Sequence, residues 1–204
     1  MKRAPIKVIL PILLVVVLIV VLVVTGRIIP RAPSDDHPLV IVIYTDFQCG
    51  PCGRLHSEVD PELRARYVAT GKAQIEIRVL AAMDPVYSMR AAQAALCAGD
   101  QGRFLEYTDA LFEAYSEDED PTVFSVEALT QIAVDLGLDE AAFAGCLDSE
   151  AKGAEIEENM TMAREDGIRT LPTLLVGDVT IQGRKPLEPY IQAIEEALSA
   201  PQTQ

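Results

Sequence analysis

The sequence predicts an α/β fold in which a strand, a helix and a second strand come first, a helical insertion follows, and two strands and a helix close the chain. An apolar, β-branched run at residues 39–44 indicates a buried strand, and residues 74–80 alternate polar and apolar side chains with the period of a strand. Between them, residues 52–67 have a helical pattern. A unit of this length is typical of two parallel strands joined by a helix.

The chain is then predicted to be helical up to about residue 166 before it returns to strands. Ser125 precedes one helical segment as a candidate N-cap, and residues 116–121 indicate an acidic loop between two helices. Gly177 and Asp178 separate two short apolar runs, which predicts a hairpin. The predicted helices are residues 89–96, 104–115, 126–136, 140–147, 150–165 and 187–198, and the hairpin strands are residues 173–176 and 179–182.

An apolar segment at residues 8–24 follows three basic residues near the N-terminus. Its length of about 17 residues spans roughly 25 Å as a helix, just enough for the hydrocarbon core of a bilayer. A cleaved signal peptide and an uncleaved anchor are both open. Because no A-x-A cleavage pattern follows, we expect an anchor with its basic end in the cytoplasm. Residues 1–36 would form the cytoplasmic end, transmembrane helix and Pro-containing tether, and residues 37–204 an extracytoplasmic domain.

The charge of the chain is concentrated after this segment. All 31 acidic residues lie at or beyond Asp35, whereas five of the 17 basic residues precede it, so the part from Asp35 onward carries about −19. Phosphate binding requires the opposite sign, which excludes nucleic acid as a partner. A solvated surface is the simplest role for this charge, and a docking surface for a basic partner is the alternative. The chain has no long heptad run, so we expect a monomer.

Cys49-Gly50-Pro51-Cys52 lies between the first predicted strand and the first predicted helix. The N-terminus of a helix presents unpaired N–H groups and the positive end of the helix dipole, which stabilise a thiolate on Cys49. Because a thiolate is the species that attacks a disulfide, this placement favours Cys49 as a nucleophile and the pair as a redox centre.

Two other interpretations of this motif are half of a zinc site and an inert structural disulfide. Zinc would need two more ligands with matching spacing. The remaining cysteines and histidines (His37, His56, Cys97 and Cys146) stand apart from one another. We therefore predict a redox pair and no metal site.

The element order, the CGPC motif and a segment at residues 167–177 that contains Leu171-Pro172-Thr173 resemble the thioredoxin superfamily. A helical insertion at about residues 84–166 narrows the resemblance to the DsbA-like branch of thiol–disulfide oxidoreductases. The likeness covers roughly residues 38–198. Segments similar to that branch occur at residues 45–49, 95–98, 101–104 and 143–147.

The resemblance implies that Pro172 follows a cis peptide bond and faces the disulfide. The backbone of Leu171 would then offer an edge to an extended substrate, and Gly50 and Pro51 would contact that substrate beside the cysteines. A cis X-Pro bond is uncommon and is usually a specific structural feature. An ordinary trans proline that opens a strand is the alternative.

In an oxidising compartment we further expect a structural disulfide between Cys97 and Cys146, which lie in different predicted helices. Closing a loop of this length stabilises a fold by about 4 kcal/mol in the chain-entropy model. Two free thiols, or a second redox couple that relays electrons, are the alternatives.

The chain departs from the DsbA-like pattern at two places. Many members carry a buried acid six residues before the first cysteine, where this chain has Ile43, so the group that takes the proton of Cys52 is open. Asp46 and His56 are candidates for that proton transfer, and a solvated helix face is the alternative for His56. The Gly-Pro dipeptide is that of thioredoxin, whereas DsbA-type oxidants usually carry a histidine there.

We therefore expect a membrane-anchored, extracytoplasmic thiol–disulfide oxidoreductase that introduces disulfides into secreted or membrane proteins and needs no cofactor of its own. Cys49 would form the mixed disulfide with substrate, and Cys52 would resolve it. The resemblance implies two partners, a reduced or unfolded secreted protein and a quinone-linked membrane enzyme of the DsbB or vitamin K epoxide reductase type. A reductase or isomerase, and a non-catalytic or copper-handling binding module, are the alternatives.

Overall fold

The computed structural model describes residues 38–118 and 120–200, and the predicted transmembrane segment lies outside them. In this part of the chain no helix is long and apolar enough to cross a membrane. The elements in chain order are β1 (Leu39–Thr45), α2 (Gly50–Glu58), α3 (Asp60–Leu63), the π-helical turn η1 (Arg64–Val68), β2 (Ala73–Val79), α4 (Tyr87–Asp100), α5 (Phe104–Asp118), the 3₁₀ turn η2 (Pro121–Phe124), α6 (Val126–Asp135), α7 (Glu140–Asp148), α8 (Gly153–Glu165), β3 (Thr173–Val176), β4 (Val179–Gln182) and α9 (Leu187–Ser199).

The strands of the described residues form one sheet in the order β2-β1-β3-β4. β1 pairs with β2 in parallel and with β3 in the antiparallel direction, and β3 and β4 form a hairpin. In the hairpin turn Gly177 has a φ of 54°, a left-handed conformation that glycine adopts without a steric penalty. The predicted order of strands and helices, with a helical insertion between β2 and β3, is confirmed.

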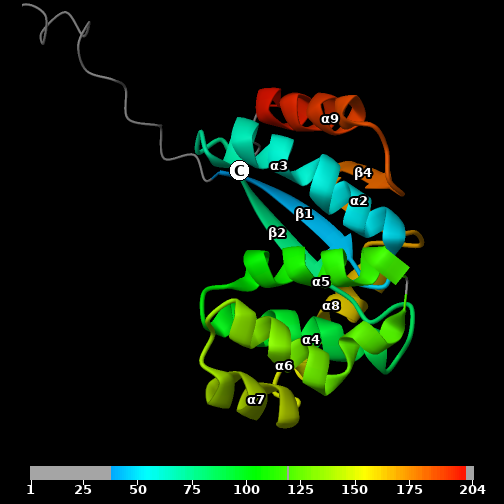
Figure 1. The fold of residues 1–204 in the computed structure, drawn as a ribbon. Helices are drawn as coiled ribbons and strands as arrows, with labels where there is room; N and C mark the ends of the chain where they lie inside the picture. Colours follow the sequence, from blue (N-terminus) through cyan, green and yellow to red (C-terminus); the bar gives the residue numbers. More distant parts are fainter. Residues whose placement is uncertain (1–37, 119, 201–204) are drawn as a thin grey trace, which may run out of the picture. The chain divides into compact units, whose positions relative to one another are not determined.

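The two faces of the sheet are covered by different parts of the chain (Figure 1). Successive side chains of a strand point to opposite faces. Ile41 and Ile43 of β1 accordingly join a buried cluster with Leu55 of α2 and Ile194 of α9. Tyr44, on the opposite face, joins a cluster with residues that include Ala163 of α8. Helices α2, α3 and α9 therefore cover one face, and the insertion covers the other.

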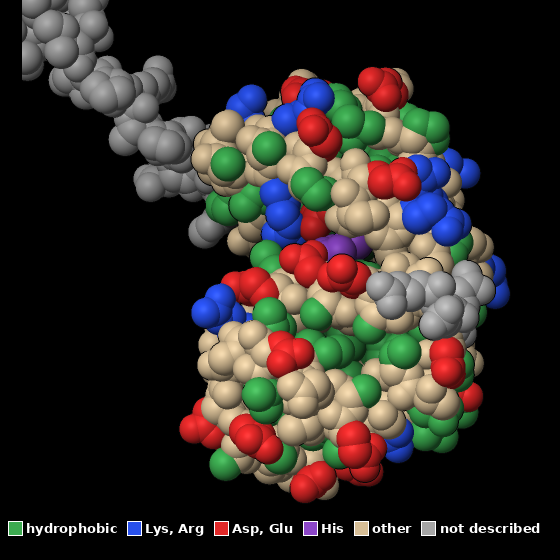
Figure 2. Space-filling view, in the orientation of Figure 1, with side chains coloured by type: hydrophobic (Ala, Val, Ile, Leu, Met, Phe, Trp, Pro, Cys, Tyr) green, Lys and Arg blue, Asp and Glu red, His purple; other side chains and the backbone are tan. Residues whose placement is uncertain are grey.

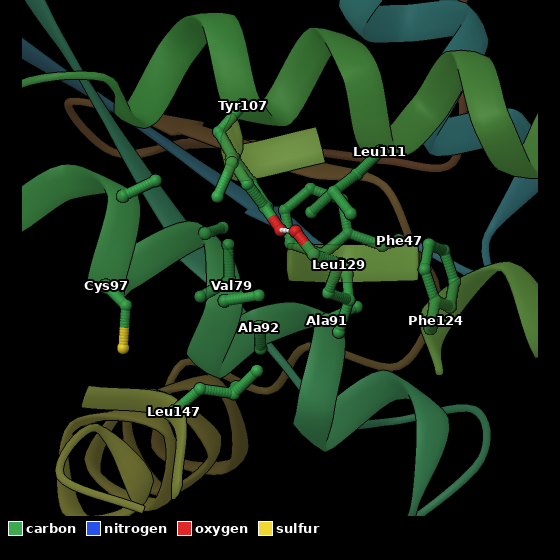
Figure 3. Close-up of a cluster of buried hydrophobic side chains, with 14 of the residues drawn as sticks. Phe47, Val79, Ala91, Ala92, Cys97, Tyr107, Leu111, Phe124, Leu129 and Leu147 are labelled. Atoms are coloured by element: carbon green, nitrogen blue, oxygen red, sulfur yellow. Dashed lines mark hydrogen bonds between the residues drawn. The ribbon is translucent and has the colours of Figure 1, made fainter. Parts of the chain in front are cut away.

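The insertion forms most of a further buried cluster, drawn in Figure 3, which also includes Phe47, Val79 and the two cysteines of the redox pair. Helix α4 runs through this cluster, and the alanines of α4 are fully buried. Their small side chains let the neighbouring helices pack closely against the α4 backbone. From α5, the buried hydroxyl of Tyr107 donates a hydrogen bond to the carbonyl of Leu129 at 2.7 Å, and burial raises the pKa of Tyr107. Cys97 of α4 and Cys146 of α7 form the expected disulfide, which ties two helices of this cluster together.

The helix predicted over residues 52–67 is divided in three. Helix α2 ends at Glu58, α3 starts at Asp60, and a π-helical turn follows from Arg64. Pro61 explains the first break, because a proline inside a helix removes a backbone donor, whereas a proline in the first turn of a new helix is tolerated. Asp60 is the first residue of α3, and its side chain is buried.

Two smaller differences concern the insertion. Helix α8 begins at Gly153 instead of residue 150, because Glu150 adopts a φ of 53° that no helix accommodates. The predicted acidic loop contains the end of α5 and the start of a 3₁₀ turn whose N-cap, Asp120, accepts a hydrogen bond from the Thr122 amide. The acidic composition of residues 116–121 did not indicate the end of α5 or the 3₁₀ turn, because acidic residues indicate solvent exposure and not backbone conformation.

We predict that replacing both Cys97 and Cys146 by alanine lowers the free energy of unfolding by about 4 kcal/mol, because the bond closes a long loop in the unfolded chain. Urea denaturation of the oxidised proteins measures the difference. Reducing the wild type should produce the same loss without further effect in the double variant. An unchanged midpoint would show that this disulfide adds nothing to stability.

Candidate active site

The redox pair lies at the N-terminus of α2, directly after the loop that leaves β1. Cys49 is the N-cap residue, and Cys49 and Cys52 form a disulfide with their Cα atoms 5.2 Å apart. The amides of Cys52 and Gly53 donate to the carbonyl of Cys49 at 2.8 and 3.2 Å, so the cysteine is part of the first helical turn. In the reduced protein the helix dipole and the N–H groups of this turn would favour a thiolate on Cys49.

The two cysteines face different surroundings. Cys49 lines an open cavity of about 510 Å³ between α2 and α5, whereas Cys52 lines a smaller one behind it. Gly53 keeps the first turn of α2 close to α5, because a Cβ there would lie 3.3 Å from the ring of Phe112. Asp109 and Glu113 of α5 line the open cavity. Figure 2 shows a histidine in a hollow between the two halves of the molecule, with acidic side chains along its edge.

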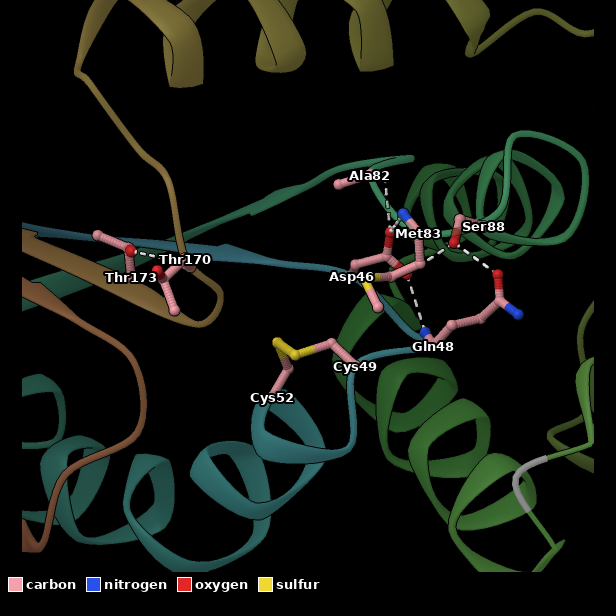
Figure 4. Close-up of a disulfide and its surroundings, with 9 residues drawn as sticks. All are labelled: Asp46, Gln48, Cys49, Cys52, Ala82, Met83, Ser88, Thr170 and Thr173. Carbon is pink, nitrogen blue, oxygen red and sulfur yellow. Dashed lines mark hydrogen bonds between the residues drawn. A yellow bond between two sulfur atoms is a disulfide. The ribbon is translucent and has the colours of Figure 1, made fainter.

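The loop that enters β3 lies on another side of the disulfide (Figure 4). The Leu171–Pro172 peptide bond is cis, as the resemblance implies. The carbonyl of Pro172 accepts a hydrogen bond from the Gly183 amide at 2.8 Å, and Thr173 donates to the carbonyl of Thr170, so the loop is fixed to the hairpin. Leu171 packs against the buried cluster that contains both cysteines. The substrate contacts assigned to this loop and to the Gly-Pro dipeptide stay predictions.

Asp46 is fully buried, and both of its carboxylate oxygens accept hydrogen bonds (Figure 4). Oδ1 accepts from the Gln48 amide and the Ser88 hydroxyl, both at 2.8 Å. Oδ2 accepts from the amides of Ala82 and Met83 at 2.7 and 3.0 Å. These bonds connect the end of β1 to the segment that leads into α4. They give Asp46 a structural role, and its part in proton transfer stays a prediction.

His56, one turn after Cys52, lies between two carboxylates instead of on a solvated helix face. Its side chain is 12% exposed, its Nε2 is 2.5 Å from Asp109 Oδ1, and its Nδ1 is 3.7 Å from Asp60 Oδ2. The ring also lies 5.2 Å from the ring of Phe112. His56 therefore connects the interior behind the cysteines with α5, and its role in proton transfer stays a prediction.

Two polar residues near the redox pair were missed by sequence reasoning. Asp60 is 2% exposed and pairs with Arg64 at 2.7 Å, and Thr108 of α5 is fully buried. The spacing of four residues from His56 to Asp60 and from Asp60 to Arg64 is the signal that could have indicated one cluster. Nothing in the sequence indicates that Thr108 lies close by.

No group of three or more His, Cys, Asp or Glu side chains in the described ranges is arranged to hold a metal ion. Both described cysteine pairs are disulfide-bonded, so no free thiol remains among them. The chemistry offered by the described site is thiol–disulfide exchange between two buried sulfurs, 5% exposed at Cys49 and 1% at Cys52, of which the first borders the open cavity.

Comparison with known proteins agrees with this geometry. The thioredoxin family model matches residues 34–196. Oxidised BdbD from Bacillus subtilis is 21% identical with a TM-score of 0.72, and the match covers 82% of this chain and 91% of BdbD. DsbA from Chlamydia trachomatis is 21% identical with a TM-score of 0.65, over 82% of this chain and 88% of that one. At this level of identity the likeness shows the fold alone.

Among curated relatives, the uncharacterised protein YwbO of Bacillus subtilis is 28% identical over 92 residues, which are 45% of this chain and 46% of YwbO. The chain spans less than half the length of the curated relatives it matches. The family model, in contrast, covers most of the chain, including the strand that delivers Cys49 and the loop with the cis proline. The chain therefore belongs to the thioredoxin family, and its fold is of the DsbA type, with a helical insertion between β2 and β3.

Proposed function

We propose that this protein is a thiol–disulfide oxidoreductase that works through Cys49 and Cys52. The observation that carries the proposal is the different placement of the two sulfurs. Cys49 is 5% exposed and borders the open cavity, from which a substrate can approach it, whereas Cys52 is 1% exposed and lines the smaller cavity behind it. An attacking sulfur that borders open space, with a resolving sulfur behind it, is the arrangement that thiol–disulfide exchange uses.

In the oxidising direction, the disulfide of the enzyme is exchanged for a disulfide of the substrate in two steps. A substrate thiolate bonds to the sulfur of Cys49, the Cys49–Cys52 bond breaks, and Cys52 leaves with the electron pair and takes up a proton. A second substrate thiolate then attacks the substrate sulfur of the mixed disulfide. The substrate leaves with a disulfide, and the enzyme is left with two reduced cysteines that a redox partner must reoxidise.

We propose the oxidising direction and an extracytoplasmic location, in which residues 8–24 anchor the domain of residues 37–204 to the membrane. The apolar segment and the disulfide pairing of all described cysteines support this location, because such bonds persist in oxidising compartments. Reduced secreted or membrane proteins are the proposed substrates, and a quinone-linked membrane enzyme the proposed oxidant. The domain acts as a monomer in this proposal.

A reductase or isomerase of the same fold is the second candidate, favoured by the Gly50-Pro51 dipeptide, which lacks a cation beside the thiolate. The two candidates share Cys49 and Cys52 and differ in the free energy of the disulfide. The reduction potential therefore separates them.

We predict that Cys52→Ala traps a mixed disulfide between Cys49 and a reactive peptide disulfide, because the resolving sulfur is missing. Intact mass spectrometry under non-reducing conditions detects the adduct. Cys49→Ala should form none and should lose exchange activity, while Cys97 and Cys146 stay bonded in both variants. Equal trapping by the two variants would contradict the assignment of roles.

We predict a reduction potential for the Cys49–Cys52 pair nearer to about −120 mV, typical of DsbA, than to about −270 mV, typical of thioredoxin. Equilibration in glutathione buffers, with thiols counted by mass, measures it. The Cys97/Cys146 double alanine variant is the control that limits the count to one pair. A value close to that of thioredoxin would replace the oxidase proposal by the reductase or isomerase.

We predict that the full-length protein stays with membranes after alkaline carbonate extraction, because residues 8–24 are long and apolar enough to span the bilayer. A variant that begins at His37 should remain in the supernatant. A mature chain whose mass lacks the apolar segment would instead identify a cleaved signal peptide.

A further inference from the structure

A small cavity lies behind the redox pair, next to the open one that Cys49 lines, and His56 and Phe112 line both. The small cavity has a volume of about 10 Å³. It brings Cys52 together with polar side chains from three parts of the fold, namely Thr45 of β1, His56 and Asp60 of the α2–α3 segment, and Thr108 of α5. The other lining side chains are apolar, and they come from β1, β2, α2 and α5.

Two polar atoms of this lining have no hydrogen-bond partner among the described residues. They are Asp60 Oδ1 and Thr108 Oγ1, and both side chains are almost completely buried. Buried polar groups in proteins are nearly always paired, with other protein groups or with ordered water. A cavity needs about 10–15 Å³ to hold a water molecule, so this one is at the lower limit for a single water beside these two atoms.

The remaining contacts of Asp60 lead toward the surface. Its Oδ2 accepts a hydrogen bond from Arg64 Nε at 2.7 Å and lies 3.7 Å from His56 Nδ1. The other nitrogen of His56 contacts Asp109, whose side chain is 68% exposed. A chain of polar groups therefore runs from the cavity beside Cys52 through Asp60 and His56 to solvent.

We propose that Asp60, acting through one water in this cavity, exchanges the proton of Cys52 during thiol–disulfide exchange. The inference rests on the proposed function, because Cys52 changes protonation only when its bond to Cys49 forms or breaks. When that bond breaks, the Cys52 thiolate takes a proton from the water, and Asp60 and His56 restore the proton of the water from solvent. When the bond forms, the same groups carry the proton outward.

Asp60 is the carboxylate in the lining of this cavity, and the other titratable side chain beside Cys52 there is His56, whose Nε2 contacts Asp109. Ile43, Leu55, Ile77 and Phe112 carry no titratable group, and the Thr108 hydroxyl only orients the water. The charged or titratable groups that face Asp60 are His56 and Cys52 from α2 and Arg64 from η1, and Asp109 from α5 faces His56. Removing the carboxylate therefore removes a step in proton movement without removing either reacting sulfur.

The test follows two steps separately in the full-length protein. Reduced protein is mixed with oxidised glutathione, samples are quenched in acid, and mass spectrometry distinguishes the reduced form, the Cys49–glutathione mixed disulfide and the Cys49–Cys52 disulfide. The rate at which Cys52 resolves the mixed disulfide is measured as a function of pH. We expect Asp60→Asn to slow this second step by about 100-fold and to remove an inflection from its pH profile, while the first step is unchanged.

Two further variants distinguish a proton route from a structural ion pair. Glu62→Gln changes an exposed acid of the same short helix, which pairs with Arg66, and should leave both steps unchanged. Thr108→Val keeps the side-chain shape and the Asp60–Arg64 pair but removes the partner of the water, and should slow the second step about tenfold. If Asp60→Asn does not fold, Thr108→Val decides the question.

A folded Asp60→Asn protein that resolves the mixed disulfide at the wild-type rate, with the wild-type pH profile, would overturn this inference alone. A wild type that forms no mixed disulfide at Cys49 would overturn the proposed function, and this inference with it.

Discussion

The position of the redox pair depends on the buried carboxylate of Asp46. A buried charge without a cationic partner is costly unless hydrogen bonds replace its hydration, and Asp46 accepts them from three backbone amides and the hydroxyl of Ser88. Two of the amides belong to the segment after β2, and Ser88 belongs to α4. The same carboxylate therefore joins the end of β1 to the first helix of the insertion, three residues before Cys49. The orientation of the first turn of α2, and of the insertion beside it, follows from this junction.

The chemistry of the site lies on two sides of the α2–α3 segment. On one side, the first turn of α2 places Cys49 at an open cavity. On the other, Asp60 in the first turn of α3 is buried and lines the small cavity together with Cys52. Cys52, His56 and Asp60 are spaced by four residues, so they share one helix face despite the break between α2 and α3. The helical spacing therefore gives the second sulfur its polar neighbours.

Much of the fold follows from local patterns, whereas the polar partners of the site do not. The apolar run of β1, the period of two in β2 and the Gly-Asp turn are local signals, and the structure agrees with them. Pro61 is compatible with both a kinked helix and a new helix, so the sequence did not decide between them. His56 was predicted near Cys52 because one helical turn separates them. Its partner Asp109 is 53 residues away, and such a contact depends on how α5 packs against α2.

The direction of exchange depends on how strongly the fold stabilises a thiolate on Cys49, because a stabilised reduced form makes the disulfide more oxidising. Two effects oppose each other. Carboxylates of α5 lie along the open cavity, and their charge disfavours a second anion nearby. Asp109 is 68% exposed, however, so water and salt screen its charge, whereas the N–H groups in the first turn of α2 act on Cys49 at close range. The local effect is therefore the stronger one on a thiolate at Cys49. A helix N-terminus of this kind is also present in thioredoxin, whose cysteine pair is strongly reducing, so the helix alone does not set the direction. The proposed oxidising direction depends on the sum of the two effects, which the reduction potential measures.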